Sequence, residues 1–199
     1  MANICFTEVT IKTSQKRSAD ILERRFVETL FPDPAKPDPE DRWLGNLLVQ
    51  LGMPKEDVLN GKALRCRGTV VYFMRDDDKT ISLSTESAWV PMIKCIRKFV
   101  DAHVDDAEVF YIAEEPNMDI FWTNNPDVAG NVWVDWEEVS AETEKFLVSV
   151  RDKKEKDATK AFEERLGHPG KLEKLAEELA ETENAFISVH TYEYRDATD

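Results

Sequence analysis

The sequence is short of the residues on which most enzyme and metal motifs depend. It has seven glycines in 199 residues, and they do not cluster into a phosphate-binding loop. Its three histidines are scattered, so neither His-Glu-x-x-His nor a spaced zinc ligand set occurs. The Gly-x-Ser-x-Gly turn of serine hydrolases is absent too. These gaps favour a protein that is not an enzyme, and we expect no metal or cofactor.

Long apolar runs and paired cysteines are also missing. No stretch approaches the ~18 apolar residues of a membrane span, and the first residues lack the basic flank of a signal peptide. The three cysteines, Cys5, Cys66 and Cys95, are odd in number and widely spaced, which is typical of a reducing compartment. We therefore expect a cytoplasmic chain that does not enter a membrane.

The chain does contain enough hydrophobic residues for a core, and its acidic residues outnumber its basic ones. Hydrophobic residues make up 42% of it, and five are tryptophans. Its length fits one domain, or one domain with an appendage. The formal net charge of −14 disfavours nucleic-acid binding through a basic surface.

The negative charge is concentrated in one window, residues 101–144. This window holds 13 acidic residues and no lysine or arginine, which leaves 27 acidic and 26 basic residues for the rest of the chain. The same window contains Trp122, Trp133 and Trp136. Acidic and aromatic residues without basic ones are the sharpest feature of the sequence.

Three interpretations of the acidic window remain open. Alternating strands produce solvated acidic rims routinely. A concentrated negative face also selects a basic protein partner and raises its association rate, in which case Asp105, Asp106 and Glu108 are candidate binding residues. The third interpretation is a divalent cation site.

Glu114, Glu115 and Asp119 form the best candidate for acid–base or metal chemistry. Glu114 ends one predicted strand and Asp119 opens the next, so a tight hairpin would bring these carboxylates together. Paired carboxylates separate their pKa values or hold Mg²⁺ or Ca²⁺. A further alternative is a sugar- or peptide-binding module, for which at least two of the rings of Trp122, Trp133 and Trp136 must be exposed and coplanar.

The periodicity of the first two thirds predicts an α+β fold. Strands are expected at 3–12, 69–74, 81–84 and 109–113, and helices at 14–31 and 91–104. Residues 76–79, with three aspartates in a row, predict a solvated hairpin turn between the second and third strands. The first helix is expected to bury one stripe, made of Ala19, Leu22, Phe26 and Leu30. This order is that of the ferredoxin-like βαββαβ sandwich, an antiparallel sheet with both helices on one face. Residues 32–65 interrupt it as an insertion, which begins with an exposed loop that has four prolines in eight residues at 32–39. A short helix is expected at 43–51 within this insertion.

The remainder predicts two short strands at 120–123 and 132–134, one long helix from Ser140 to about Leu166, a helix at 172–179 and a last strand at 186–194. We expect a ferredoxin-like domain at 1–136, with 137–199 packed on it as a helical addition.

Three local patterns resemble a known family. They are Met-Ala-Asn-x-Cys at 1–5, Thr-Glu-Ser-Ala-Trp-Val-Pro at 85–91 and Tyr-Ile-Ala-Glu-Glu at 111–115. With residues 1–12 and 68–123 around them, they are similar to the YubB-like ferredoxin-like family of plasmid, phage and mobile-element proteins. The resemblance implies the ferredoxin-like fold and a bacterial mobile-element or phage setting, in which accessory proteins that bind host proteins are common. It carries over no catalytic residues.

Trp89 separates two hypotheses about this region. Between a strand and the helix that Pro91 opens, its ring would plug the end of the sheet. The alternative is an exposed platform for a ligand.

Overall fold

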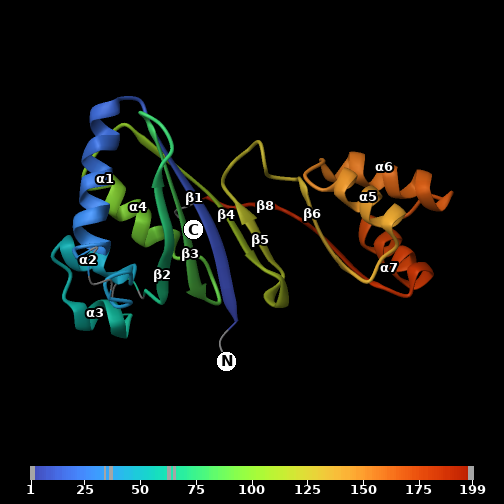
Figure 1. The fold of residues 1–199 in the computed structure, drawn as a ribbon, viewed down its shortest axis with the longest axis horizontal. Coiled ribbons are helices and arrows are strands. Elements are labelled where there is room, and N and C mark those ends of the chain that lie inside the picture. Colours follow the sequence, from blue (N-terminus) through green and yellow to red (C-terminus); the bar gives the residue numbers. More distant parts are fainter. Residues whose placement is uncertain (1–2, 34, 36–37, 62–63, 65, 197–199) are drawn as a thin grey trace. The chain divides into compact units, whose positions relative to one another are not determined.

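The computed structural model describes residues 3–33, 35, 38–61, 64 and 66–196, shown with their elements in Figure 1. Parts of the predicted proline-rich loop and of the Met-Ala-Asn-x-Cys pattern lie outside these residues. The chain forms two compact units, residues 1–120 with 195–199, and residues 121–194. It is a mixed α and β protein, and most of its strand pairs are antiparallel.

The first unit is built on four strands, β1 (Ile4–Thr13), β2 (Gly68–Arg75), β3 (Thr80–Ala88) and β4 (Ala107–Glu115). They lie in the order β2-β3-β1-β4, and each is antiparallel to its neighbour. The predicted strands and the hairpin between 69–74 and 81–84 are confirmed. The first strand of the chain therefore lies inside the sheet, between two strands that come later in the sequence.

Two helices, α1 (Lys16–Leu30) and α4 (Ile93–Asp101), cover one face of this sheet (Figure 1). The buried side of α1 is the predicted stripe of Ala19, Leu22, Phe26 and Leu30. Phe26 lies 4.8 Å, between ring centroids, from Phe99 of α4 and 5.5 Å from Phe73 of β2. Both predicted helices are confirmed.

The insertion contributes to the core of the first unit. It contains α2 (Gly45–Gln50) and α3 (Lys55–Asn60), and Leu44, Leu47 and Leu48 are fully buried. Gly45 allows this packing, because a Cβ there would lie 2.1 Å from the ring of Trp43. The short helix predicted at 43–51 is confirmed, but the segment is more than an exposed loop.

The structure contradicts the prediction that Trp89 plugs the end of the sheet. Trp89 is 50% exposed and has a left-handed backbone, with φ of 78°. Residues of the insertion and of the turn before α4 pack instead against the start of β2. A Cβ built on Gly68 would lie 2.9 Å from Leu44 and 3.2 Å from Met92. The ring is therefore free to lie outside the core.

The outer edge of the sheet, strand β2, is partly covered. The chain at 42–44 runs along its first residues, with the Val70 amide donating to the Arg42 carbonyl at 2.9 Å and the Leu44 amide to the Gly68 carbonyl at 2.9 Å. Beyond this segment a bulge between Val70 and Tyr72 shifts the register with β3. Only the second half of β2 continues as a regular edge.

The second unit has its own apolar core. Strands β6 (Val132–Glu137) and β7 (Phe186–Thr191) pair antiparallel, and helices α5 (Ala141–Val150), α6 (Glu155–Leu166) and α7 (Leu172–Glu183) pack with them. Strands β5 (Ile120–Thr123) and β8 (Glu193–Tyr194) pair parallel to each other. The strands predicted at 120–123 and 132–134 are confirmed, and β6 belongs with the C-terminal helices.

The single long helix predicted from Ser140 is wrong. Ser140 does cap α5, accepting a hydrogen bond from the Thr143 amide at 3.2 Å. The helix ends at Val150, however, because the next residues bond to the start of β6. Val132 donates to the Lys153 carbonyl at 2.8 Å, and Asp152, with φ of 64°, donates to the Val132 carbonyl at 2.9 Å. Residues 151–154 thus connect α5 to α6.

Candidate functional site

The face of the first unit's sheet that lies away from α1 and α4 carries an unusual set of side chains. Strand β1 alternates strictly, with Cys5, Thr7, Val9 and Ile11 buried beneath the helices. The residues between them, from Ile4 to Lys12, therefore lie on the opposite face. We call this surface the open sheet face.

The register of the strands brings an aromatic ring between two carboxylates on the open sheet face. Phe6 pairs with Glu86 of β3 on one side and with Glu114 of β4 on the other. Side chains of directly paired residues are ~4.5–5.5 Å apart at Cβ. Phe6 is 55% exposed, so its ring remains accessible. We call Glu86, Phe6 and Glu114 the Phe6 row.

The neighbouring rows of the sheet also carry acidic and apolar side chains. Glu8, two residues along β1, pairs with Ser84 and Ile112. Tyr72 pairs with Ser84 at the outer edge, and it is exposed. In the other direction Ile4 pairs with Ala88 and is exposed as well. Apolar and acidic side chains therefore share one continuous surface of the sheet.

Trp89 borders this surface beside Ile4. Its amide donates to the Asn3 carbonyl at 3.0 Å, which continues the pairing of β1 with β3. Val90, the next residue, is also exposed. A bulky residue with positive φ is strained, and such residues gather at functional sites. Trp89 thus adds exposed apolar area at the end of the open sheet face.

Basic residues on the open sheet face are few. Lys12 lies in the row that pairs with Thr80 and Glu108, and its ammonium is 5.4 Å from the centroid of the Phe110 ring. At the other end, around Phe6, the paired positions are occupied by the carboxylates of Glu8, Glu86 and Glu114. The charge at that end of the face is negative.

The acidic window of residues 101–144 is divided between the two units, because the boundary falls at 120/121. Most of its carboxylates are exposed. Of the three predicted binding residues in the first unit, Asp105 and Glu108 are exposed, whereas Asp106 is half-buried.

Asp106 is a structural residue. Its carboxylate accepts hydrogen bonds from the amides of Ser14 and Gln15, both at 3.1 Å, at the start of α1. Hydrogen bonds from Ser14, Ser18 and the Gln15 amide hold the pKa of Asp106 below its ordinary value. Sequence spacing gave no sign of this contact, which joins positions far apart in the chain.

Glu114, Glu115 and Asp119 do not share one face. Glu114 lies on the open sheet face, while Glu115, the next residue of β4, points under the helices and is 2% exposed. Asp119 follows the short helix η1 (Pro116–Met118) in a left-handed conformation and is exposed. In the part of the chain that the structure describes, no group of three or more His, Cys, Asp or Glu side chains is arranged to hold a metal ion.

The tryptophans of the window do not form a flat platform. Trp133 belongs to an aromatic cluster of the second unit, 4.9 Å from Phe121 and 5.8 Å from His190 between ring centroids. Trp136, three residues on, therefore faces the other side of β6, where it packs against the helical core and lies 4.8 Å from the Arg151 guanidinium. All three rings, including that of Trp122, are half-buried.

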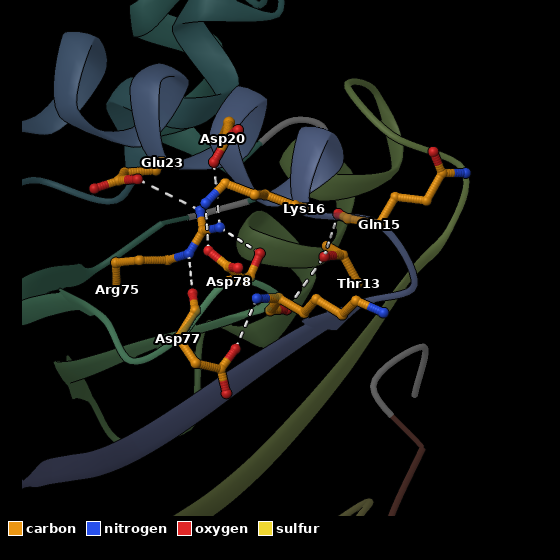
Figure 2. Close-up of polar contacts among 9 residues, drawn as sticks. Thr13, Gln15, Lys16, Asp20, Glu23, Arg75, Asp77 and Asp78 are labelled. Carbon is orange, nitrogen blue, oxygen red and sulfur yellow. Dashed lines mark hydrogen bonds and ion pairs between the residues drawn. The ribbon is translucent and has the colours of Figure 1, made fainter.

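A second polar cluster lies at the turn between β2 and β3 (Figure 2). Arg75 donates to the carbonyls of Asp77 and Asp78 and lies 3.3 Å from Asp20 and 3.4 Å from Glu23 on α1. Lys16 pairs with Asp78. The turn of three aspartates, predicted to be a solvated hairpin turn, is thereby tied to α1.

The hollow beside this turn has a volume of about 690 Å³ and is lined by Lys12, Thr13, Asp77, Asp78, Lys79 and Thr80. The Lys79 amide donates to Asp77 at 2.7 Å, and this bond lowers the pKa of that carboxyl. The polar groups of the turn thus form hydrogen bonds and ion pairs within the protein, which indicates a structural role for the turn.

Comparison of the chain with family models, curated proteins and solved structures finds no match. Among the described residues, no helix is both long and apolar enough to cross a membrane. The functional argument therefore rests on the site itself.

Proposed function

We propose that this protein is a non-enzymatic interaction protein, and that the open sheet face of its first unit binds a basic segment of another protein. The observation that carries the proposal is the Phe6 row. An exposed aromatic ring lies between the carboxylates of Glu86 and Glu114, with Glu8 in the next row.

Both the carbon stem and the charged head of a lysine or arginine side chain suit such a surface. Their carbon stems cover apolar area, here that of Phe6 and Ile4, while the charged heads remain near water or a carboxylate. A cation over an aromatic ring gains ~0.5–1 kcal/mol at an exposed site. The surrounding carboxylates add attraction over a longer range and speed association.

The proposed surface uses only some of the residues of the acidic window, from which the sequence predicted a basic protein partner. From the acidic window it keeps Glu108 and Glu114, which lie on the open sheet face, and it adds Glu8 and Glu86 from outside the window. Asp106 is left out because its carboxylate is bonded to the backbone just before α1. A carboxylate enzyme or a tryptophan platform gains less support, since the residues they require are on different faces.

We also propose that the first unit is a ferredoxin-like sandwich of the YubB-like kind, from a mobile-element or phage setting. The strand order β2-β3-β1-β4, the antiparallel neighbours and the position of α1 and α4 on one face support it. Amide-to-amide NMR contacts across β1–β3 and β1–β4 test the arrangement. Parallel pairing of either would contradict it.

The binding proposal is tested with a fluorescent synthetic peptide in which lysine and leucine alternate. Fluorescence anisotropy gives the dissociation constant for the wild type and for two variants, Phe6→Ala and the double amide Glu8→Gln with Glu86→Gln. Each should weaken binding about fivefold or more, the factor that ~1 kcal/mol represents. Added salt should weaken wild-type binding further.

The matched control is Glu173→Gln with Glu177→Gln, which removes the same charge from exposed positions of α7 in the second unit. It should bind the peptide as the wild type does. If the two double amides lose equal affinity and Phe6→Ala loses none, the peptide responds only to net charge, and the proposed site is wrong.

A further inference from the structure

The Phe6 row lies in the interior of its sheet, away from either edge. Its residues belong to β3, β1 and β4, and each of these strands has a neighbour on both sides in the order β2-β3-β1-β4-β5. Phe6 pairs with Glu86 on one side and with Glu114 on the other. The amides and carbonyls of an interior strand are used by its two neighbours. A segment bound over this row therefore meets only side chains.

This restriction bears on the backbone of the bound segment. An extended segment over the row would find no backbone partner in the sheet, and a polar group that loses water without gaining a hydrogen bond is costly. An α-helix bonds its own amides to its own carbonyls and needs none from the protein. Recognition through side chains alone thus favours a helix.

An extended segment would gain backbone hydrogen bonds only at an edge of the sheet. The edge nearer to β1 is β2, which lies beyond β3. A strand added to β2 would be three strand spacings, roughly 14 Å, from β1. Its side chains would stand beside Tyr72 and Met74 and would not reach Phe6.

We propose that the partner of the open sheet face is a basic amphipathic α-helix, which lies along β1 with its apolar stripe over Ile4 and Phe6. The inference rests on the proposed function, because it names the partner of that same surface. The apolar contact is at this end of β1, since Trp89 borders Ile4 and the charged Glu8 follows Phe6 on the same face.

The carboxylates on either side of β1 match the width of a helix. Glu86 and Glu114 are on strands two spacings apart, roughly 10 Å. A helix with its side chains is roughly 10–12 Å wide. Lysines or arginines on both sides of the apolar stripe therefore reach one carboxylate each. Ile4 is 45% exposed and Phe6 55%, so the stripe has apolar area to cover.

Two peptides of identical composition separate a helix from an extended segment. The helical-period peptide has three repeats of Leu-Lys-Lys-Leu followed by Leu-Lys, which places its leucines on one side of a helix. The alternating peptide has seven repeats of Leu-Lys, which places them on one side of a strand. Because length, charge and leucine content are equal, a difference in affinity reports the conformation of the backbone.

Fluorescence anisotropy with the full-length chain should give a dissociation constant about tenfold or more lower for the helical-period peptide, a difference of ~1.4 kcal/mol. Short helices are marginal in water, so circular dichroism should show this peptide gaining helix when the protein is added. Replacing its seventh residue, a lysine, by proline should weaken binding more than replacing it by alanine, because the charge is then equal and proline breaks a helix.

Phe6→Ala shows where the peptide binds. This change should weaken binding of the helical-period peptide about fivefold or more. The matched control is Phe186→Ala, which removes the same atoms from a position in the second unit that is 52% exposed. It should bind both peptides as the wild type does, and circular dichroism checks that both variants are folded.

The helix and the binding surface fail in different ways. If the alternating peptide binds as tightly as the helical-period peptide, and Phe6→Ala weakens it, the surface is right and the helix is wrong. Tighter binding of the helical-period peptide without a gain of helix also overturns the helix. If Phe6→Ala binds both peptides as the wild type does, the surface itself is wrong, and the helix falls with it.

Discussion

The carboxylate of Asp106 accepts a hydrogen bond of 2.6 Å from the hydroxyl of Ser14. Asp106 lies just before β4 and Ser14 just before α1, so the bond joins the starts of two elements that are distant in sequence. With the two amide bonds to the same oxygen, it holds the backbone just before α1 in place.

Replacing Asp106 by Asn should destabilise the protein, whereas replacing the exposed Asp105 by Asn should leave its stability unchanged. The hydrogen bonds that lower the pKa of Asp106, chiefly from Ser14, favour its ionised form in the native state. That contribution is present above the pKa of an unfolded aspartate and is lost as the pH falls through the lowered native pKa.

Urea unfolding at several pH values measures the effect. The difference between wild type and Asp106→Asn should be largest near neutral pH and should shrink in acid. A loss of equal size in Asp105→Asn would show that charge alone, and not this contact, is responsible.

Trp89 allows a comparison of two truncations. Trp89→Ala should change the free energy of unfolding by no more than about 0.5 kcal/mol, as most surface changes do. Trp89→Gly should be more stable than Trp89→Ala by about 1 kcal/mol, because only glycine adopts the positive φ of this position without strain. Denaturation of both variants checks the order. A loss of several kcal/mol in Trp89→Ala would restore the plug hypothesis.

Phe26 should be among the costliest residues to truncate. It is fully buried and contacts the rings of Phe73 and Phe99. Phe26→Ala should lower the free energy of unfolding by about 3–5 kcal/mol, since it removes apolar contacts and leaves a cavity. Phe6→Ala removes the same atoms from an exposed site and should cost far less, which chemical denaturation of the pair would show.

Gly45 should not tolerate even one added methyl group. A Cβ there meets the Trp43 ring at 2.1 Å, so Gly45→Ala should cost about 1–3 kcal/mol by overpacking. Combining it with Trp43→Leu should cost less than the sum of the two single changes, because the clash is then removed. Additive losses in this double-mutant cycle would mean that the ring does not cause the effect.

Much of the first unit could be predicted because its signals are local. The spacing of Ala19, Leu22, Phe26 and Leu30 identified the buried side of α1, and all four are buried. The position of Trp89 could not be predicted, because its neighbours in sequence do not reveal its left-handed backbone. The structural role of Asp106 could not be predicted either, because its hydrogen-bond partners lie more than 90 residues away in the sequence.

The candidate site was harder to predict than the fold. Glu114 was singled out by its neighbours in sequence, yet Glu115 beside it faces the core. Phe6 and Glu86 were not singled out at all, because only the pairing of three strands brings positions 6, 86 and 114 into one row. Alternation along β1 would have placed Phe6 opposite Cys5 and Val9, on the exposed side, but not beside any particular acid.

The partial covering of the β2 edge by residues 42–44 affects how the protein behaves at high concentration. A sheet with exposed apolar side chains on one face is at risk of joining other copies edge to edge, as amyloid-forming strands do. Here residues 42–44 occupy the first part of the edge, and the bulge after Val70 distorts the strand beyond them. Strand addition is thus obstructed along the first part of this edge, and another copy of the chain could pair only with the second half of β2.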